Sequence, residues 1–236
     1  NAGKKPRGDE ARKQWASLSS AISKIGIDAK FIRPADGLPD MVFTANAGLI
    51  LNEKCALSTF RHPERQGEEK HFEAWFKENG FSTYFPVTGS FEGEGDALFG
   101  NDLLVMGYGF RTDISTHYEV ANFLGYPTEK VLSVELVNPY FYHLDTCFCP
   151  LHDNLALITP EGFSEDSLRD LETRFQLIKV SKEDSQRFAC NSVVNNKNII
   201  IPAGCNNTAS QLEAIGYTVF QVEMSEFILA GGAAKC

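Results

Sequence analysis

The chain has 236 residues, of which 43% are hydrophobic and 22% charged, and its net charge at pH 7 is −9. This composition is typical of a globular protein, and the acidic balance argues against nucleic acid as the main partner, because phosphate binding depends on clustered cations. No apolar run approaches the roughly 20 residues of a membrane helix, and the N-terminus has no apolar segment of the signal-peptide type. We therefore expect a soluble, cytoplasmic protein without a membrane partner.

The first part of the chain alternates between predicted helices and strands. Apolar residues at helical spacing predict a helix over residues 7–25, and Gly26 separates it from a predicted strand over residues 29–32. Two strands, a helix and a third strand come next. Their predicted ranges are 47–51, 55–60, 67–78 and 81–85.

The same order of strand, strand, helix and strand returns along the rest of the chain. The predicted ranges are 96–99, 103–106, 113–124 and 131–136, then 143–151, 155–158, 164–174 and 176–180, then 192–195, 198–201, 208–215 and 217–222, and a short helix over 225–229. Gly, Asn and Asp residues fall between the elements, as is usual for turns. The pattern predicts an α/β protein of ββαβ units that forms a single domain over residues 1–236, with short segments missing at both ends.

Five polar or nucleophilic residues recur along these repeats at intervals of 45 to 49 positions. They are Asn46, Glu94, His143, Asn191 and Cys236. A fixed period of this length predicts repeated units around a common axis, which brings a thiol, an imidazole and a carboxylate to one centre. Because these groups make a nucleophile, a proton carrier and an orienting acid, we predict an enzyme.

The segment around His143 offers several possible metal ligands. Alternate residues of a strand share a face, so a strand over residues 143–151 places His143, Asp145, Cys147 and Cys149 on one side. The first and last of these then lie about 20 Å apart, whereas zinc ligands lie within about 2.3 Å of the ion. We therefore expect that this segment binds no metal. We expect Cys147 and Cys149 to be buried free thiols, and His143 and Asp145 to have catalytic roles. The alternative for His143 is a core histidine bonded to a backbone carbonyl.

Two further segments carry candidate groups. Residues 91–96 place three acids among glycines before a strand, which permits close approach of a ligand, and the alternative is an acidic loop in solvent. Cys236 follows a glycine pair behind the last predicted helix, where it presents a thiol to a cavity or is an incidental cysteine at a frayed end. The thiolate is the reactive form, and a cationic substrate beside it lowers its pKa.

Four segments together resemble the guanidino-group-modifying enzymes. They are residues 38–48 (LPDMVFTANAG), 91–96 (FEGEGD), 143–146 (HLDT) and 231–236 (GGAAKC). This superfamily includes arginine deiminases, dimethylarginine dimethylaminohydrolases, amidinotransferases and arginine dihydrolases. The resemblance implies their fold, a five-bladed pseudo-symmetric α/β propeller called the pentein, and a small-molecule substrate, arginine or a close derivative. It implies no metal and no organic cofactor, and a homo-oligomer is left open.

The resemblance also assigns catalytic roles by motif. It implies that Cys236 is the nucleophile, His143 the general acid and base, and Asp145 a ligand of the substrate guanidinium. Relatives usually carry the catalytic glutamate three residues before the aspartate that ends the second motif, and this chain has glycine there. The flanking Glu92 and Glu94 are both candidates, and we favour Glu94.

The remaining assignments concern substrate binding. Asp40 and Asn46 fall where relatives contact the guanidinium, and Arg65 and Arg111 resemble the arginines that bind the substrate α-carboxylate, with solvated surface arginines as the alternative. Arginine deiminases carry aspartate in place of Asn46, whereas asparagine resembles the dihydrolases, which remove both nitrogens. We therefore predict an arginine dihydrolase. The alternatives are a dimethylarginine dimethylaminohydrolase, an arginine deiminase, an amidinotransferase and, in a different class, a non-catalytic binding pentein.

Overall fold

The computed structural model describes residues 5–236, so the first four residues of the predicted domain lie outside it. The described residues divide into two compact units. Unit 1 contains residues 5–30, 145–160 and 175–236, and unit 2 contains residues 31–144 and 161–174. No helix in residues 5–236 is long and apolar enough to cross a membrane.

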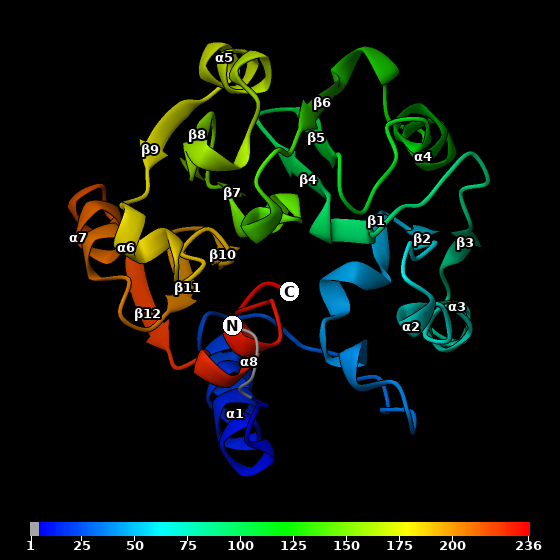
Figure 1. Ribbon diagram of the computed structural model, residues 1–236, viewed down its shortest axis with the longest axis horizontal. Helices are drawn as coiled ribbons and strands as arrows, with labels where there is room; N and C mark the ends of the chain where they lie inside the picture. The colour runs from blue at the N-terminus through cyan, green and yellow to red at the C-terminus, as the bar shows by residue number, and fades with distance from the viewer. Residues whose placement is uncertain (1–4) are drawn as a thin grey trace. The chain divides into compact units, whose positions relative to one another are not determined.

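Unit 2 contains two three-stranded sheets with the same topology (Figure 1). In each, the first two strands form an antiparallel hairpin and the third strand, which follows a helix, pairs in parallel with the second. The first repeat consists of β1 (Gly48–Leu51), β2 (Lys54–Leu57), α2 (Pro63–Gln66), α3 (Glu69–Glu78) and β3 (Ser82–Tyr84). The second consists of β4 (Ala97–Gly100), β5 (Leu103–Tyr108), α4 (Thr116–Leu124) and β6 (Val131–Glu135).

The core of unit 2 lies between these sheets and their helices. Leu104 and Met106 point from β5 into a cluster that includes Val120 of α4, and all three are fully buried. Phe72 and Phe76, one turn apart on α3, pack in a second cluster with the apolar side chains of β2. Residues at i and i+2 of a strand and at i and i+4 of a helix share a face, so the alternation in the sequence determines which side chains enter the core. Each such burial contributes about 1.5–3 kcal/mol.

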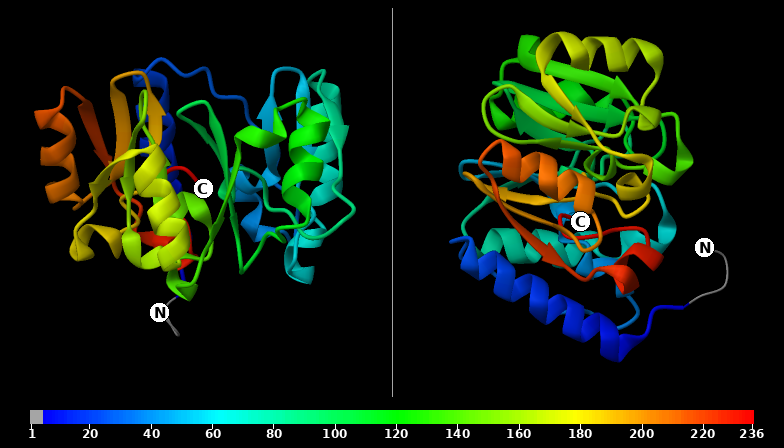
Figure 2. Two further views of the ribbon diagram at one scale, coloured as in Figure 1. Left: turned by 90° about the horizontal axis from the view of Figure 1, so that it is seen from above. Right: turned by 90° about the vertical axis from the view of Figure 1, so that its left-hand side faces the viewer.

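Unit 1 contains two more sheets of this topology. They consist of β7 (Phe148–Pro150), β8 (Leu155–Ile158) and β9 (Gln176–Lys179), then, after α6 (Lys182–Ser185), β10 (Val193–Asn195), β11 (Asn198–Pro202), α7 (Asn206–Ala214) and β12 (Thr218–Val222). Helix α5 (Glu165–Arg174), which connects β8 to β9, belongs to unit 2 and packs there on β6. Two more helices of unit 1, α1 (Gly8–Lys24) and α8 (Ser225–Leu229), come from opposite ends of the chain, and α1 lies beside both α8 and β12 (Figure 2).

Most predicted elements form with ends shifted by a few residues, but the strand predicted at residues 29–32 is absent. These residues have no strand partner among residues 5–236. Their side chains are exposed or half-buried, and Phe31 is 60% exposed. Only Ile32 packs, half-buried, against a core cluster, and the stretch pairs with no strand, so the prediction of a strand is wrong there.

The strand predicted at residues 143–151 is much shorter. Residues Leu144–Thr146 form a 3-10 turn, and β7 begins only at Phe148. The turn rotates successive side chains away from strand alternation, so the prediction that His143, Asp145, Cys147 and Cys149 share one face of a strand is wrong. The predicted burial of the cysteines is confirmed, because all six are free and buried.

Comparable 3-10 turns stand in front of the first strands of other repeats. Thr44–Ala47 precedes β1, Gly93–Gly95 precedes β4, and Leu144–Thr146 precedes β7. Three of the five residues picked out by their period, Asn46, Glu94 and His143, therefore lie at equivalent places in successive ββαβ repeats, in or beside these turns. Asn191 lies two residues before β10, and Cys236 follows α8.

Candidate active site

In unit 1, the thiol of Cys236 is packed against two polar side chains. Helix α8 ends at Leu229, and the chain then turns at Gly231, whose φ of 100° lies in the left-handed region that favours glycine. Cys236 Sγ lies 3.2 and 3.4 Å from the carboxylate oxygens of Asp145 and 3.0 Å from Asn191 Nδ2. Because Cys236 is only 7% exposed, this segment is packed and the alternative of a frayed end is wrong.

The surroundings of Cys236 favour the neutral thiol. Burial raises the pKa of the thiol well above its usual range, and the charge and hydrogen bond of Asp145 raise it further, whereas the hydrogen bonds from Asn191 and from the backbone N–H of Ala233 lower it. The neutral thiol therefore donates its hydrogen to Asp145 and accepts one from Asn191. A cation bound beside Asp145 offsets the carboxylate charge and promotes the thiolate.

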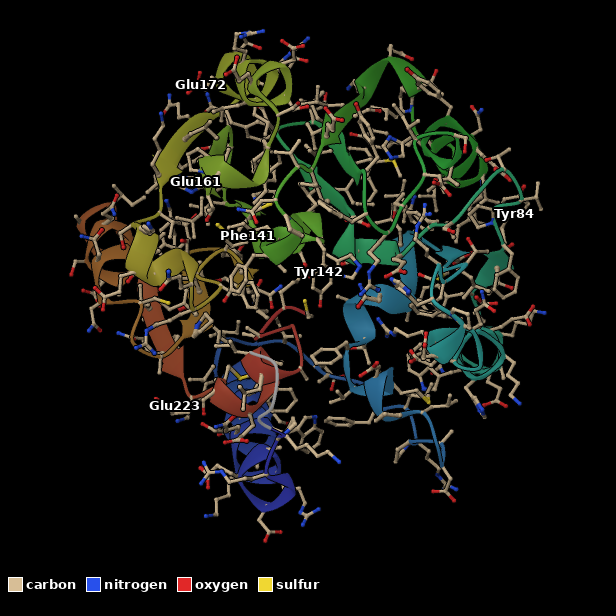
Figure 3. All side chains as sticks on the ribbon, viewed as in Figure 1. Tyr84, Phe141, Tyr142, Glu161, Glu172 and Glu223 are labelled. Atoms are coloured by element: carbon tan, nitrogen blue, oxygen red, sulfur yellow. The ribbon has the colours of Figure 1, made fainter. Side chains whose placement is uncertain are left out.

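In unit 2, His143 is hydrogen-bonded to Glu92. His143 Nε2 lies 2.7 Å from Glu92 Oε2, and both side chains are buried. Arg111 Nη1 lies 3.1 Å from the same oxygen, and its guanidinium lies 4.6 Å from the ring centre of Tyr142, which is labelled in Figure 3. Burial raises the pKa of Glu92, but the hydrogen bond and charge of His143, together with the charges of Arg111 and Arg65, outweigh it and lower the pKa to about 2. The ionised Glu92 thus stabilises a protonated His143, the form that donates a proton.

Asp96 holds the backbone next to both members of this pair. Its Oδ1 accepts a hydrogen bond from the N–H of Leu144, directly after His143, at 3.0 Å. Its Oδ2 accepts from Thr112 Oγ1 at 2.7 Å, and Thr112 Oγ1 in turn accepts from the N–H of Glu92 at 3.1 Å. Burial raises the pKa of Asp96 to about 6, although the charge of His143 and the hydrogen bond from Thr112 lower it.

The two candidate glutamates differ in burial and in their contacts. Glu92 is fully buried and contacts His143, whereas Glu94 is half-buried. Gly93, between them, has a φ of 58° and begins a 3-10 turn. The carboxylate beside the imidazole is Glu92, and the catalytic role of either glutamate stays a prediction.

Several predicted substrate-binding residues of unit 2 form a buried cluster. Arg65 is paired with Glu68, with Nε 3.1 Å and Nη2 2.8 Å from its carboxylate oxygens. Arg65 Nη1 donates to Asn46 Oδ1 at 2.8 Å, and Nη2 donates to the backbone oxygen of Asp40 at 3.1 Å. Asn46 Nδ2 donates to the backbone oxygen of Glu92 at 3.3 Å. These contacts fix the amide of Asn46, and they bury Arg65, so that the alternative of a solvated surface arginine is wrong for this residue.

The predicted site residues thus fall into two groups, each within one unit. Unit 1 brings together Cys236 and Asp145. Unit 2 connects the others through the contacts above, except for Glu94: they are His143, Glu92, Arg111, Asn46, Arg65 and Asp40. Binding of an α-carboxylate by the two arginines stays a prediction. Within residues 5–236, no group of three or more His, Cys, Asp or Glu residues is arranged to hold a metal ion.

Sequence reasoning did not identify some residues of these groups. Glu68 was detectable, since it follows Arg65 by three residues, a spacing that brings side chains together on a helix. Asn191 was among the periodic residues of the sequence, but the period alone assigned it no role. No motif or spacing in the sequence singled out Thr112. Its contacts depend on residues 16 and 20 positions away.

Comparison with known proteins identifies relatives over nearly the whole chain. The family model described as N,N dimethylarginine dimethylhydrolase, eukaryotic, matches residues 3–236. The bifunctional arginine dihydrolase/ornithine cyclodeaminase ArgZ of Synechocystis is 44% identical over 234 residues, which are 97% of this chain and 33% of ArgZ. The N(G),N(G)-dimethylarginine dimethylaminohydrolase of Mycobacterium tuberculosis is 38% identical over 229 residues, which are 96% of this chain and 74% of that protein.

A solved structure extends the similarity to the fold. The crystal structure of the N-terminal domain of ArgZ covalently bound to a reaction intermediate matches with a TM-score of 0.93 and 43% identity, over 98% of this chain and 86% of that chain. This chain spans about a third of the length of ArgZ itself. Because the family model covers residues 3–236, the chain belongs to the dimethylarginine dimethylhydrolase family, within the superfamily of guanidino-group-modifying enzymes.

Proposed function

We propose that this protein is a hydrolase that cleaves guanidino C–N bonds and that its substrate is arginine. The observation that carries the proposal is the Asp145 carboxylate, 3.2 Å from the buried thiol of Cys236. An anion in this place opposes formation of the thiolate unless a cation is bound beside it. A guanidinium supplies both that cation and an electrophilic carbon for the sulfur. The similarity to ArgZ and to the mycobacterial dimethylaminohydrolase supports the same substrate class.

The proposed reaction begins with attack of the Cys236 thiolate on the guanidino carbon. His143, paired with Glu92, protonates the departing nitrogen, which leaves as ammonia, and an amidino group remains bonded to the sulfur. His143 then takes a proton from water, and the hydroxide formed attacks the same carbon, so that the C–S bond breaks and citrulline is released. One water is consumed and one ammonia is formed in this cycle.

The chain itself supports a single reaction centre. Only one residue separates His143 from Asp145 in the sequence, so their Cα atoms are at most about 7 Å apart. Asp145 in turn contacts the sulfur of Cys236. We therefore propose that the proton carrier and the nucleophile act on the same substrate carbon.

We further propose that the reaction continues from citrulline to ornithine, with release of a second ammonia and carbon dioxide. Asn46, a buried neutral amide, supports this step, because a neutral ureido group lacks the charge that would favour an aspartate in its place. The relative ArgZ is a bifunctional arginine dihydrolase, which agrees with this assignment. In total, two waters are consumed for each arginine.

Product analysis tests this proposal. Purified protein is incubated with arginine, and ornithine, citrulline and ammonia are quantified over time. We expect two ammonia for each ornithine, whereas citrulline as the final product with one ammonia contradicts the second step. If no ammonia forms and ornithine is released only when an acceptor amine is added, the protein is an amidinotransferase. An intact-mass spectrum after brief mixing is expected to show an adduct with the mass of arginine less ammonia, which is lost in Cys236→Ser.

A dimethylarginine dimethylaminohydrolase is the second candidate, because the matching family model carries that description. The same assay with N,N-dimethylarginine measures release of dimethylamine. A higher kcat/KM for this substrate than for arginine favours the second candidate. If neither substrate is consumed and Cys236→Ser changes no measured activity, the results favour a non-catalytic binding protein over both enzymes.

We also propose that the two units form one catalytic domain with the five-bladed pentein fold. The ββαβ repeats and the TM-score of 0.93 with the ArgZ domain support this assignment. A cytoplasmic location and a homo-oligomer remain predictions.

A further inference from the structure

Asn191 has no part in the reaction above, yet its side chain is fully buried against the Cys236 segment. Its Oδ1 accepts hydrogen bonds from the backbone N–H groups of Ala233, Lys235 and Cys236 at 3.0, 3.1 and 3.0 Å. Its Nδ2 donates to Cys236 Sγ at 3.0 Å and to the backbone oxygen of Asp145 at 3.3 Å. One amide thus contacts the sulfur, the backbone that carries it and the residue beside it.

These contacts determine which end of the amide faces the thiol. Three backbone N–H groups require an acceptor, so the oxygen of Asn191 must face the Cys236 segment and the NH₂ group must face the sulfur. The opposite orientation sets the NH₂ group of Asn191 against these backbone donors and leaves the buried N–H groups of Ala233 and Cys236 without this acceptor. The backbone of Asn191 is held as well, because its N–H donates to the oxygen of Phe188 at 2.8 Å and its oxygen accepts from the N–H of Lys235 at 3.2 Å.

We propose that Asn191 is a further catalytic residue, which stabilises the Cys236 thiolate through Nδ2 and holds the segment that presents the thiolate through Oδ1. This inference rests on the proposed role of Cys236 as the nucleophile. A hydrogen bond from an amide to an anionic sulfur is stronger than one to a neutral thiol, so Asn191 favours the charged form. The charged groups next to the thiol in unit 1 are Asp145, which opposes the thiolate, and Lys235, its neighbour in the chain.

Asn191→Asp separates the two roles of the amide. The carboxylate keeps an acceptor for the backbone N–H groups but replaces the NH₂ donor with an anion. We expect the pH midpoint for alkylation of Cys236 by iodoacetamide, measured by peptide mass mapping, to rise by about one unit or more. We expect kcat for arginine to fall about 100-fold, with a smaller change in KM. Removal of one hydrogen-bond donor that stabilises a charged reacting atom typically has an effect of this size.

Asn195→Asp is the matched control. It makes the same change in the same unit, but the Nδ2 of Asn195 donates to the backbone oxygen of Ile25 at 2.7 Å rather than to the thiol. We expect this variant to keep the alkylation profile of the wild type. An unshifted profile in Asn191→Asp overturns the inference, whether or not arginine is consumed.

Two readouts separate the inference from the proposed function. Alkylation does not depend on arginine, so a shifted profile in a protein that consumes no arginine refutes the reaction and retains the interaction with the thiolate. If Asn191→Asp does not fold, NMR of the wild type decides. The side-chain NH₂ signals that change in Cys236→Ser are expected to follow the titration of Cys236, and signals that do not move with the thiol contradict the inference.

Discussion

At the scale of single residues, the contact between Glu92 and His143 distinguishes two acids that stand close together in the sequence. In Glu92→Gln, the amide cannot stabilise a protonated imidazole by charge, so we expect kcat for arginine to fall about 100-fold or more. Glu94→Gln is the matched comparison, and we expect a smaller loss. Steady-state kinetics of the two variants side by side measures the difference. Equal losses, or a larger loss in Glu94→Gln, would return the catalytic role to Glu94.

Asp96 provides a prediction about stability. Burial raises its pKa to about 6, against about 3.9 in an unfolded chain, so the native state binds the proton more tightly. The contribution of Asp96 to the free energy of unfolding is therefore highest below pH 4 and declines as the pH rises to about 6, by about 3 kcal/mol. Glu92, whose pKa is lowered to about 2, titrates below this window.

Asp96→Asn removes this titration. We expect the free energy of unfolding, measured with urea at several pH values between 4 and 7, to depend less on pH in the variant than in the wild type. The free energy of unfolding of the variant is expected to rise relative to that of the wild type as the pH rises. Parallel curves for the two proteins would show that the charge of Asp96 is not disfavoured by burial.

At the scale of elements, the repeats were predictable and the turns before them were not. Strand alternation, helical spacing and turn-forming residues are local signals, so the ββαβ order followed from the sequence. The 3-10 turn Leu144–Thr146 depends instead on a contact between residues 48 positions apart, from the N–H of Leu144 to Asp96. The choice between Glu92 and Glu94 depends on the turn at Gly93 in the same way. Residue types and their period therefore located the site, but not the partner of each side chain.

Two glycines of the turn Gly93–Gly95 offer a test of this close packing. A Cβ added at Gly95 would lie 2.2 Å from the side-chain nitrogen of Asn46, so Gly95→Ala displaces that amide. A Cβ at Gly93 would lie 2.7 Å from the backbone nitrogen of Gly48, and the φ of 58° disfavours alanine as well. We expect Gly95→Ala to lower kcat/KM about tenfold or more with a modest loss of stability, since the clash is with a substrate-binding candidate.

Gly93→Ala is expected to act mainly on the fold. Its clash is with backbone atoms that cannot rotate away, so we expect a loss of about 2 kcal/mol or more in the free energy of unfolding. Thermal unfolding and steady-state kinetics of both variants measure the contrast. Similar stability in the two variants would contradict the difference between a side-chain and a backbone clash.

At the scale of the whole molecule, the two ends of the chain are joined within unit 1. Arg7 donates to the buried carboxylate of Glu226 through its backbone N at 2.7 Å and its Nη2 at 2.8 Å. Gln14 Oε1 accepts from the N–H of Glu226 at 3.0 Å, and Gln14 Nε2 donates to Ser225 Oγ at 2.8 Å. Helix α1 therefore holds the start of α8, the helix that leads to Cys236. This connection joins residues more than 200 positions apart, which no local pattern in the sequence predicts.

Gln14→Ala tests whether this connection supports the Cys236 segment. The change leaves the buried N–H of Glu226 without its partner, which costs about 1–3 kcal/mol, and it also removes the hydrogen bond to the exposed Ser225. We expect faster hydrogen exchange in residues 225–236 and a lower kcat, with little change in exchange for β1 to β3 of unit 2. Gln211→Ala is the control, because this half-buried glutamine of α7 donates its side-chain hydrogen bond to Asn207 on its own helix. If exchange in residues 225–236 stays at the wild-type rate in Gln14→Ala while stability falls, α1 stabilises unit 1 without positioning the thiol, and the order of the segment then depends on Asn191.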